Sequence, residues 1–157
     1  MSEELVKATY KVIGDFIHGF FKEHRNLSNF GDGKVEYEGL VYPSREAAYQ
    51  AAKSLDPEVR KQFLEYTPAK AKEKGREVQL REDWEEIKDE VMYQVVKNCV
   101  DNNDDIRQLL LSTGDKYLEE TNWWGDKYWG VYHGVGRNML GHILMAIRDK
   151  FKGSVTI

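Results

Sequence analysis

The sequence Tyr42-Pro-Ser-Arg-Glu-Ala-Ala-Tyr-Gln-Ala-Ala-Lys53 contains the strongest helix start in the chain. Pro43 disfavours helical geometry at Tyr42, because its ring crowds the preceding residue, and Ser44 can cap the free amides of a following turn. The alanines that come next are good helix formers. We therefore expect a helix that begins near Arg45, with the rest of the chain organised around it.

The predicted helix sorts its side chains onto two faces. At 3.6 residues per turn, small and apolar residues share one face: Ala47, Ala48, Ala51 and Leu55. The opposite face combines a carboxylate, a phenol, an amide and an amine, from Glu46, Tyr49, Gln50 and Lys53. This mixture can hold and hydrolyse a polar ligand. The alternative is ordinary solvated surface, because the helix dipole favours a glutamate in the first turn and Lys53 suits an exposed position.

Composition indicates one soluble globular domain over residues 1–157, long enough to bury a core without disulfides or metal. The net charge of -4 gives no electrostatic footprint for non-specific nucleic-acid binding. Cys99 is the single cysteine and falls on a predicted apolar stripe, which excludes an internal disulfide and indicates a buried thiol in a reducing compartment. No apolar run approaches the roughly 18 residues that span a bilayer, and the first residues lack a signal pattern. We expect a cytoplasmic protein.

Short apolar pairs near the N-terminus predict strands, and later periodic segments predict helices. The strand pairs are Val12-Ile13, Phe16-Ile17 and Phe20-Phe21, and a hairpin is expected for residues 34–37 and 40–42 around Glu38-Gly39. Further helices are expected after Asp56-Pro57, from Thr67-Pro68 to Gly75, from Asp83 to Val100, from Asn103 or Asp104 to Gly114, and from about Arg137 to Phe151. Arg148 and Lys150 suit the C-terminal dipole of the last helix. The expected class is α+β, mostly helical, with a small sheet or hairpin.

The segment 119–138, which we expect to be a loop, is unusually rich in aromatic residues and glycine. Three of the four tryptophans lie there, interleaved with glycines, so flat surfaces sit on permissive backbone that suits stacking a heterocyclic base. Gly134-Val-Gly136 before a helix is weakly similar to a phosphate cradle. The alternative is that the tryptophans fill the core beneath the loop.

Metal and nucleophile chemistry have little support. The four histidines are scattered and there is no second cysteine, so a zinc site is not expected. No Gly-x-Ser-x-Gly motif is present. Acid–base chemistry by carboxylates remains, with three candidates: Glu46, Glu119 and Asp126.

Several motifs, in this order along the chain, together resemble the NADAR (YbiA-like) family. They are Leu27-Ser-Asn-Phe30, Tyr42-Pro-Ser-x-Glu46 with Tyr49-Gln50-Ala-x-Lys53, Gly75-Arg76, Arg81-x-x-Trp84, Trp129-Gly130 and Asn138-x-Leu-Gly-x-x-Leu-Met-x-x-Arg148. The resemblance covers nearly the whole chain. It implies a compact, mostly helical α+β domain and an N-glycosidase that acts on ribosylated heterocycles, either early riboflavin-pathway intermediates or ADP-ribose attached to guanine.

The resemblance also implies roles for individual residues. Glu46 matches the catalytic glutamate and Trp84 the tryptophan of the substrate pocket. Positions that line the site are matched by Asn29, Gln50, Lys53, Arg76, Trp129, Gly130 and Asn138. Many members carry an acidic residue directly after Trp-Gly, where this sequence has Val131, so Asp126 becomes the candidate for a second catalytic acid.

No cofactor or metal is implied. The expected partner is a nucleotide or an ADP-ribosylated base, either free or within DNA, and no membrane. The alternative function is a non-catalytic ADP-ribose or nucleotide-binding module that uses the same pocket.

Overall fold

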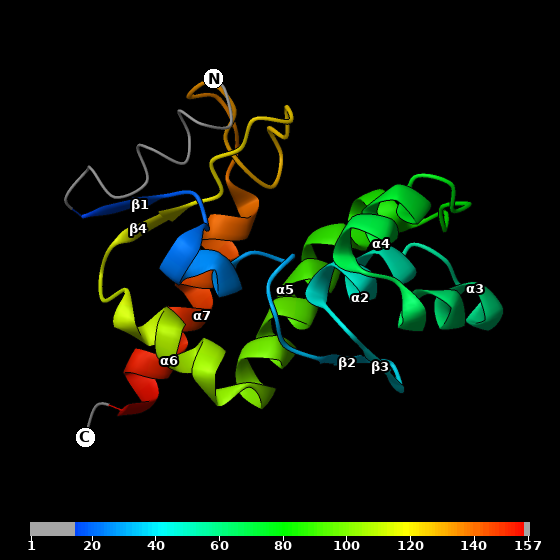
Figure 1. Ribbon diagram of the computed structural model, residues 1–157, viewed down its shortest axis with the longest axis horizontal. Coiled ribbons are helices and arrows are strands. Elements are labelled where there is room, and N and C mark those ends of the chain that lie inside the picture. The colour runs from blue at the N-terminus through cyan, green and yellow to red at the C-terminus, as the bar shows by residue number, and fades with distance from the viewer. Residues whose placement is uncertain (1–14, 156–157) are drawn as a thin grey trace. The chain divides into compact units, whose positions relative to one another are not determined.

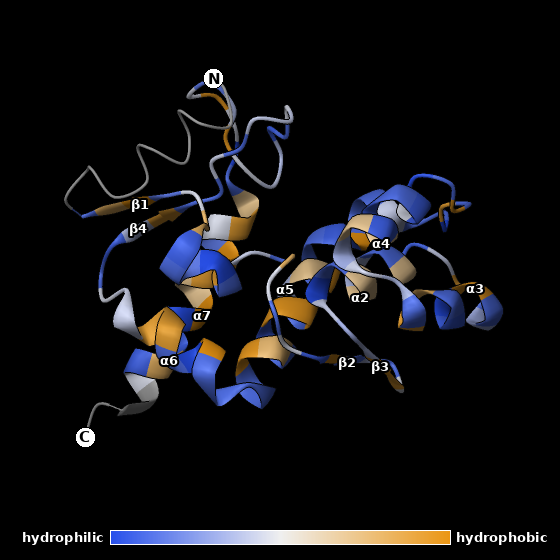
Figure 2. Cartoon of the chain, in the orientation of Figure 1, coloured by the Kyte–Doolittle hydropathy of each residue, from blue (hydrophilic) through white to orange (hydrophobic). Residues whose placement is uncertain are grey.

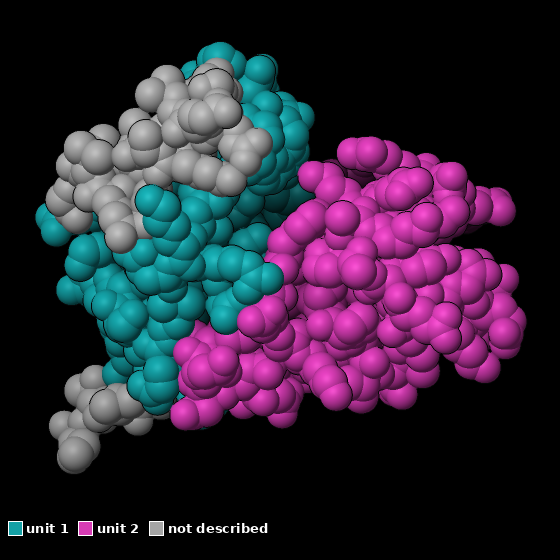
Figure 3. All heavy atoms as spheres, in the orientation of Figure 1, with its two compact units in different colours: residues 1–28, 107–157 teal, residues 29–106 magenta. Residues whose placement is uncertain are grey.

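The computed structural model describes residues 15–155, in which helices predominate (Figure 1). Contacts between backbone segments divide the chain into two compact units (Figure 3). Unit 1 contains residues 1–28 and 107–157, and unit 2 contains residues 29–106. The predicted strand at Val12-Ile13 lies outside the described residues. No helix within residues 15–155 is both long and apolar enough to cross a membrane.

Unit 2 begins with the predicted hairpin. Strands β2 (Val35–Tyr37) and β3 (Leu40–Tyr42) pair antiparallel, with Tyr37 opposite Leu40. The two residues between them, Glu38 and Gly39, have φ values of 47° and 91°. Left-handed geometry at both central positions is what a two-residue hairpin turn requires. The hairpin is confirmed, and it leads directly into Ser44 and the next helix.

Three short helices follow, and each starts with the cap that its sequence predicts. Helix α2 covers Arg45–Ala51, α3 covers Pro57–Gln62 and continues into the 3-10 turn η2 (Phe63–Glu65), and α4 covers Pro68–Gly75. The Ser44 hydroxyl accepts a hydrogen bond from the Ala47 amide at 3.0 Å. Asp56 and Thr67 cap α3 and α4 in the same way. Side-chain oxygens at these positions satisfy amides that have no partner inside the helix.

Helix α5 (Trp84–Asn102) is the core helix of unit 2. Its buried residues recur at helical spacing: Trp84, Val91, Met92, Val95, Val96, Cys99 and Val100. Figure 2 shows the corresponding alternation of apolar and hydrophilic stretches along α5. The helix packs against α2 and β2. Cys99 is buried, as predicted, and burial raises the pKa of its thiol.

Unit 1 is built from the two ends of the chain. Strand β1 (Phe16–His18) pairs parallel with β4 (Tyr117–Glu119), and the 3-10 helix η1 (Lys22–Leu27) follows β1. The predicted strand at Phe20-Phe21 is wrong, because Gly19 has a φ of 90° and turns the chain out of extended geometry.

Two helices complete the described chain. Helix α6 (Asp104–Ser112) begins in unit 2 and ends in unit 1, where α7 (Met139–Val155) packs against β4. Helix α7 begins two residues later than predicted from Arg137, because Asn138 has a φ of 53°. Arg148, expected to suit the C-terminal dipole of this helix, is buried, and its guanidinium donates to Thr113 Oγ1 and to the carbonyl of Lys116. The class is α+β, mostly helical, with two small sheets among residues 15–155.

Candidate functional site

The polar face of α2 is buried. Every residue of this helix is buried, including Glu46, of which 8% is exposed, and Gln50. The solvated-surface alternative for this face is therefore wrong. The sequence could not show this, because the cover comes from α4 and α5, which pack against α2 from later in the chain. Leu55, expected on the apolar face with the alanines, lies beyond the end of α2 and is exposed.

Glu46 is held in place through its backbone and its carboxylate. Its amide donates to the carbonyl of Asn29 at 3.2 Å, and its Oε1 accepts from Gln50 Nε2 at 2.9 Å. The residue sits in the first turn of α2, where the positive end of the helix dipole favours a negative charge. A buried carboxylate in such a setting can act as a base or stabilise a cation.

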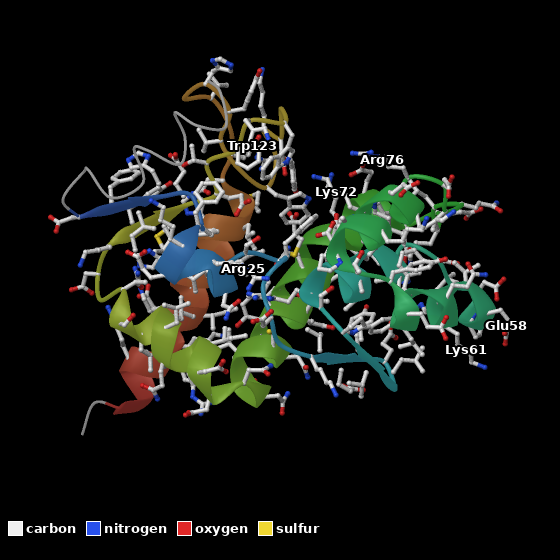
Figure 4. The ribbon with its side chains drawn as sticks, in the orientation of Figure 1. Arg25, Glu58, Lys61, Lys72, Arg76 and Trp123 are labelled. Atoms are coloured by element: carbon white, nitrogen blue, oxygen red, sulfur yellow. The ribbon has the colours of Figure 1, made fainter. Side chains whose placement is uncertain are left out.

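Lys53 interacts electrostatically with this carboxylate and with the cation Arg76. Lys53, half-buried just after α2, has a pKa below its ordinary value, chiefly because burial disfavours the charged amine. Arg76 lowers this pKa further, whereas Glu46 raises it. Arg76 itself is exposed at the end of α4 (Figure 4). Lys53 therefore interacts electrostatically with both Glu46 and Arg76, and the assignment of these three residues to one site stays a prediction.

An aromatic pair adjoins these charged groups. The rings of Tyr49 and Trp84 are tilted, with centroids 5.3 Å apart, and Lys53 Nζ lies 5.6 Å from the Tyr49 ring centroid. Trp84 is buried at the start of α5. Tyr49 was not among the residues carried over from the family, although its place on the polar face of α2 was the signal that could have found it.

Asn29 carries an unused acceptor within this cluster. Its Nδ2 donates at 3.3 Å to Met92 Sδ, and a thioether sulfur is a weak acceptor. Its buried Oδ1 has no hydrogen-bond partner among residues 15–155. Buried polar groups are nearly always satisfied, so an open acceptor here is consistent with a donor that arrives with a ligand. The structure thus brings together six of the predicted residues in unit 2: Asn29, Glu46, Gln50, Lys53, Arg76 and Trp84.

The remaining predicted residues belong to unit 1, and two of them form hydrogen bonds to its backbone. Asp126 Oδ1 accepts from the amides of Tyr128 and Trp129 at 3.0 and 2.9 Å. This is the way in which aspartate commonly stabilises a turn. A buried Asn138 side chain accepts from the Glu120 amide and donates to the carbonyl of Leu118, both at 2.9 Å. The catalytic role of Asp126 and the substrate contact of Asn138 stay predictions.

Trp129 and Gly130 complete this set. Trp129 is half-buried, and its ring meets that of Tyr128 edge to face at 4.8 Å. Gly130 is buried where a Cβ would lie 2.2 Å from the carbonyl oxygen of Glu120. Close approach of two backbone segments is therefore one reason for glycine at this position.

Several amides around the predicted phosphate cradle at Gly134-Val-Gly136 already have partners. The amide of Val135 donates to the carbonyl of Tyr132 within a tight turn. At the start of α7 the amides of Met139 and Leu140 already donate to the carbonyls of Tyr128 and Trp129. A cradle needs amides that are free to meet an anion, and these amides are taken.

The tryptophans of this loop were expected either to offer a stacking surface or to fill the core, and they differ in exposure. Trp124 is exposed, whereas Trp123 and Trp129 are half-buried. They do not simply fill the core. Trp123 stacks on Phe21 of the same unit at 5.7 Å between ring centroids.

Two further features of the described chain bear on the site. Residues 15–155 hold no group of three or more histidine, cysteine, aspartate or glutamate side chains placed to bind a metal ion. An open cavity of about 820 Å³ lies in unit 2, with Phe63, Tyr66, Val78 and Leu80 among its lining residues. Glu46 does not line this cavity. Charge, burial and hydrogen bonding converge instead at the Glu46 cluster.

Comparison with known proteins gives consistent matches. The NADAR domain family matches residues 15–152, which include parts of both units. The N-glycosidase YbiA of Escherichia coli (strain K12) is 33% identical over 147 residues, covering 88% of this chain and 91% of that protein. The riboflavin biosynthesis protein VVA0006 of Vibrio vulnificus is 36% identical over 135 residues, covering 83% of this chain and 36% of that protein.

The solved structures agree with these matches. An NMR structure of the E. coli protein YbiA has a TM-score of 0.78 and 30% sequence identity to this chain, and the match covers 95% of this chain and 92% of that one. A match of this extent confirms the predicted fold. The buried glutamate cluster therefore sits in a chain that belongs to the NADAR family and is related along most of its length to N-glycosidases.

Proposed function

We propose that this protein is an N-glycoside hydrolase that cleaves the bond between a ribose, phosphoribose or ADP-ribose and a heterocyclic base or amine. Two relatives named N-glycosidase, from E. coli and Nostoc punctiforme, support the reaction class. The observation that carries the proposal is the buried Glu46 carboxylate, which accepts from Gln50 and interacts electrostatically with Lys53, itself influenced by Arg76.

The chemistry asks for a carboxylate of this kind. Cleavage of an N-glycosidic bond passes through a sugar with oxocarbenium character at its anomeric carbon. In the proposed reaction, a water oxygen forms the new bond to that carbon while Glu46 takes the water's proton. The electron pair of the broken carbon–nitrogen bond leaves with the base, which gains a proton from solvent, and Glu46 returns the proton it took to solvent. The Glu46 charge also favours the cationic sugar.

The cations and the aromatic rings contact different parts of the rest of the substrate. Lys53 and Arg76 suit phosphate or pyrophosphate, because amine and guanidinium groups form charge-assisted hydrogen bonds to phosphate oxygens. A bound anion would raise the pKa of Lys53 and so offset the lowering that burial causes. Trp84 and Tyr49 form an apolar wall that keeps bulk water from the reacting bond.

The substrate is proposed to be a nucleotide or an ADP-ribosylated base, free or within DNA. Riboflavin-pathway intermediates are one class, favoured by the relative named a riboflavin biosynthesis protein. Guanine carrying ADP-ribose is the other class, which the family resemblance implies. Both present a ribose–nitrogen bond beside a phosphate.

The test incubates the protein with a panel of ADP-ribosylated guanine, early riboflavin intermediates, NAD and ADP-ribose, followed by product mass. We expect release of a free base or amine from at least one compound. Glu46→Gln should lower turnover about 10²- to 10⁴-fold while binding is preserved, because the change removes the charge and keeps the size. Glu58→Gln is the matched control, an exposed glutamate in the first turn of α3 (Figure 4).

The same panel tests the binding alternative. Tight binding of ADP-ribose without release of any base would replace the hydrolase with a nucleotide-binding module. Near-normal turnover in Glu46→Gln would remove Glu46 from the mechanism. If Lys53 and Arg76 form a phosphate handle, Lys53→Ala and Arg76→Ala should each weaken the binding of ADP-ribose far more than the binding of the dephosphorylated nucleoside. Lys61→Ala, at an exposed lysine, is the control (Figure 4). Equal losses for both ligands would refute that handle.

A further inference from the structure

Gln50 lies between the Glu46 carboxylate and Gly75, the last residue of α4. Its Nε2 donates to Glu46 Oε1 at 2.9 Å in a buried setting. Its Oε1 lies on the other side, where a Cβ built on Gly75 would be 1.9 Å away. The amide carbon of Gln50 would be 2.5 Å from the same Cβ. The Gln50 amide therefore rests directly against the backbone of Gly75.

The carboxylate fixes which end of the amide faces it. An amide offers a donating NH₂ and an accepting oxygen, and an ionised carboxylate can only accept. If the Gln50 amide were reversed, its oxygen would face the Glu46 oxygen and the hydrogen bond would be lost. Gln50 is thus committed to one orientation, with no room to swing away from Glu46 on the Gly75 side.

Backbone geometry does not explain a glycine at position 75. Glycines of this chain that need their conformational freedom have positive φ, and Gly75 is not among them. At a helical position alanine is more favourable than glycine. What glycine provides here is the absence of a side chain where α4 packs on α2.

We propose that Gly75 is a positioning residue for the Glu46 carboxylate and acts through Gln50. The missing Cβ lets the Gln50 amide lie flat against α4, which keeps Nε2 on Glu46 Oε1. A Cβ at position 75 displaces the flexible end of Gln50 and so releases Glu46. Gln50 supports the acting carboxylate in this arrangement. This inference rests on the proposed hydrolase function.

The first experiment compares Gly75→Ala with Gly153→Ala, a helical glycine of α7 whose Cβ would meet nothing within 4 Å. We expect Gly75→Ala to lower kcat/KM about 10- to 100-fold, because small displacements of a catalytic group have effects of this size. The acidic limb of its pH profile should move to higher pH, because the carboxylate loses a donor that stabilises its charged form. Gly153→Ala should change neither. A wild-type rate and pH profile in Gly75→Ala would overturn the proposal.

The second experiment places Gly75→Ala in a Gln50→Ala background. With the glutamine side chain gone, the new Cβ meets no amide, so the second substitution should change kcat/KM less than about twofold. The melting temperature should rise, because alanine is the better helix former. An equal loss of rate in both backgrounds would overturn the proposal, since Gly75 would then act without Gln50.

Glu46→Gln, measured in the same assay, separates this inference from the proposed function. An inactive Glu46→Gln beside a fully active Gly75→Ala refutes the positioning role alone. An active Glu46→Gln refutes the hydrolase mechanism, and the positioning role with it.

Discussion

Replacing Ser44 with alanine should destabilise the protein more than the loss of an ordinary helix cap. The Ser44 hydroxyl accepts from the Ala47 amide at 3.0 Å, and both residues are buried. Losing a cap costs about 1 kcal/mol, and a buried amide left without a partner adds about 1–2 kcal/mol. We therefore expect Ser44→Ala to lower the free energy of unfolding by about 2–3 kcal/mol. For a chain of this length, that corresponds to about 4–12 °C in Tm.

Thr67→Ala is the matched control. Thr67 caps α4 through the same type of bond, from the Lys70 amide to Oγ1 at 3.2 Å, but both residues are exposed. Water can replace the lost oxygen there, so we expect a loss of about 0.5–1 kcal/mol, or about 1–4 °C. Thermal unfolding and urea titration of both variants measure the difference. Equal losses would refute the reasoning that burial of the Ala47 amide sets the larger effect.

Three further predictions concern single side chains. Lys53→Met should raise the Tm at pH 7, because burial lowers the pKa of this lysine in the folded state. Between the lowered pKa and 10.5, the unfolded chain binds more protons than the folded chain, so the stability of the unsubstituted protein rises with pH. The gain in Tm from Lys53→Met should therefore shrink as the pH rises toward 10.5, and a gain independent of pH would contradict this. Asp126→Ala should lower the Tm whereas Asp126→Asn should not, because an asparagine oxygen can still accept from Tyr128 and Trp129. If Asp126→Asn abolishes turnover at unchanged Tm, Asp126 is catalytic after all. Cys99 should react with a thiol reagent only after unfolding, since burial raises its pKa, and rapid labelling of the native protein would disprove its burial.

Features set by neighbouring residues were predicted well from the sequence. The hairpin follows from Glu38-Gly39, whose left-handed turn needs only local residues. The starts of α2 and α4 follow from a capping oxygen beside a proline. The buried stripe of α5 follows from helical spacing, and Cys99 falls on it. Each signal lies within a few residues of the structure that it specifies.

Features that depend on distant partners were not predictable in this way. The sequence shows that Glu46 and Lys53 share a face, but burial of that face depends on helices later in the chain. The glycines before α7 have the composition of a phosphate cradle, and only the structure shows that the Met139 and Leu140 amides at the start of that helix donate to the carbonyls of Tyr128 and Trp129. Gly75 was interpreted as a helix stop, whereas its contact with Gln50 comes from packing between two helices.

The division of the chain into units has a consequence for how the protein is made. Unit 2 is one uninterrupted run, so all of its contacts become available once Ile106 has been synthesised. In unit 1, His18 of β1 is 101 residues from Glu119 of β4, the strand with which it pairs. At about 5–20 residues per second, β1 therefore waits roughly 5–20 s on the ribosome with an unpaired edge. We expect the middle of the chain to fold first, and the nascent first strand to be the segment that chaperones protect.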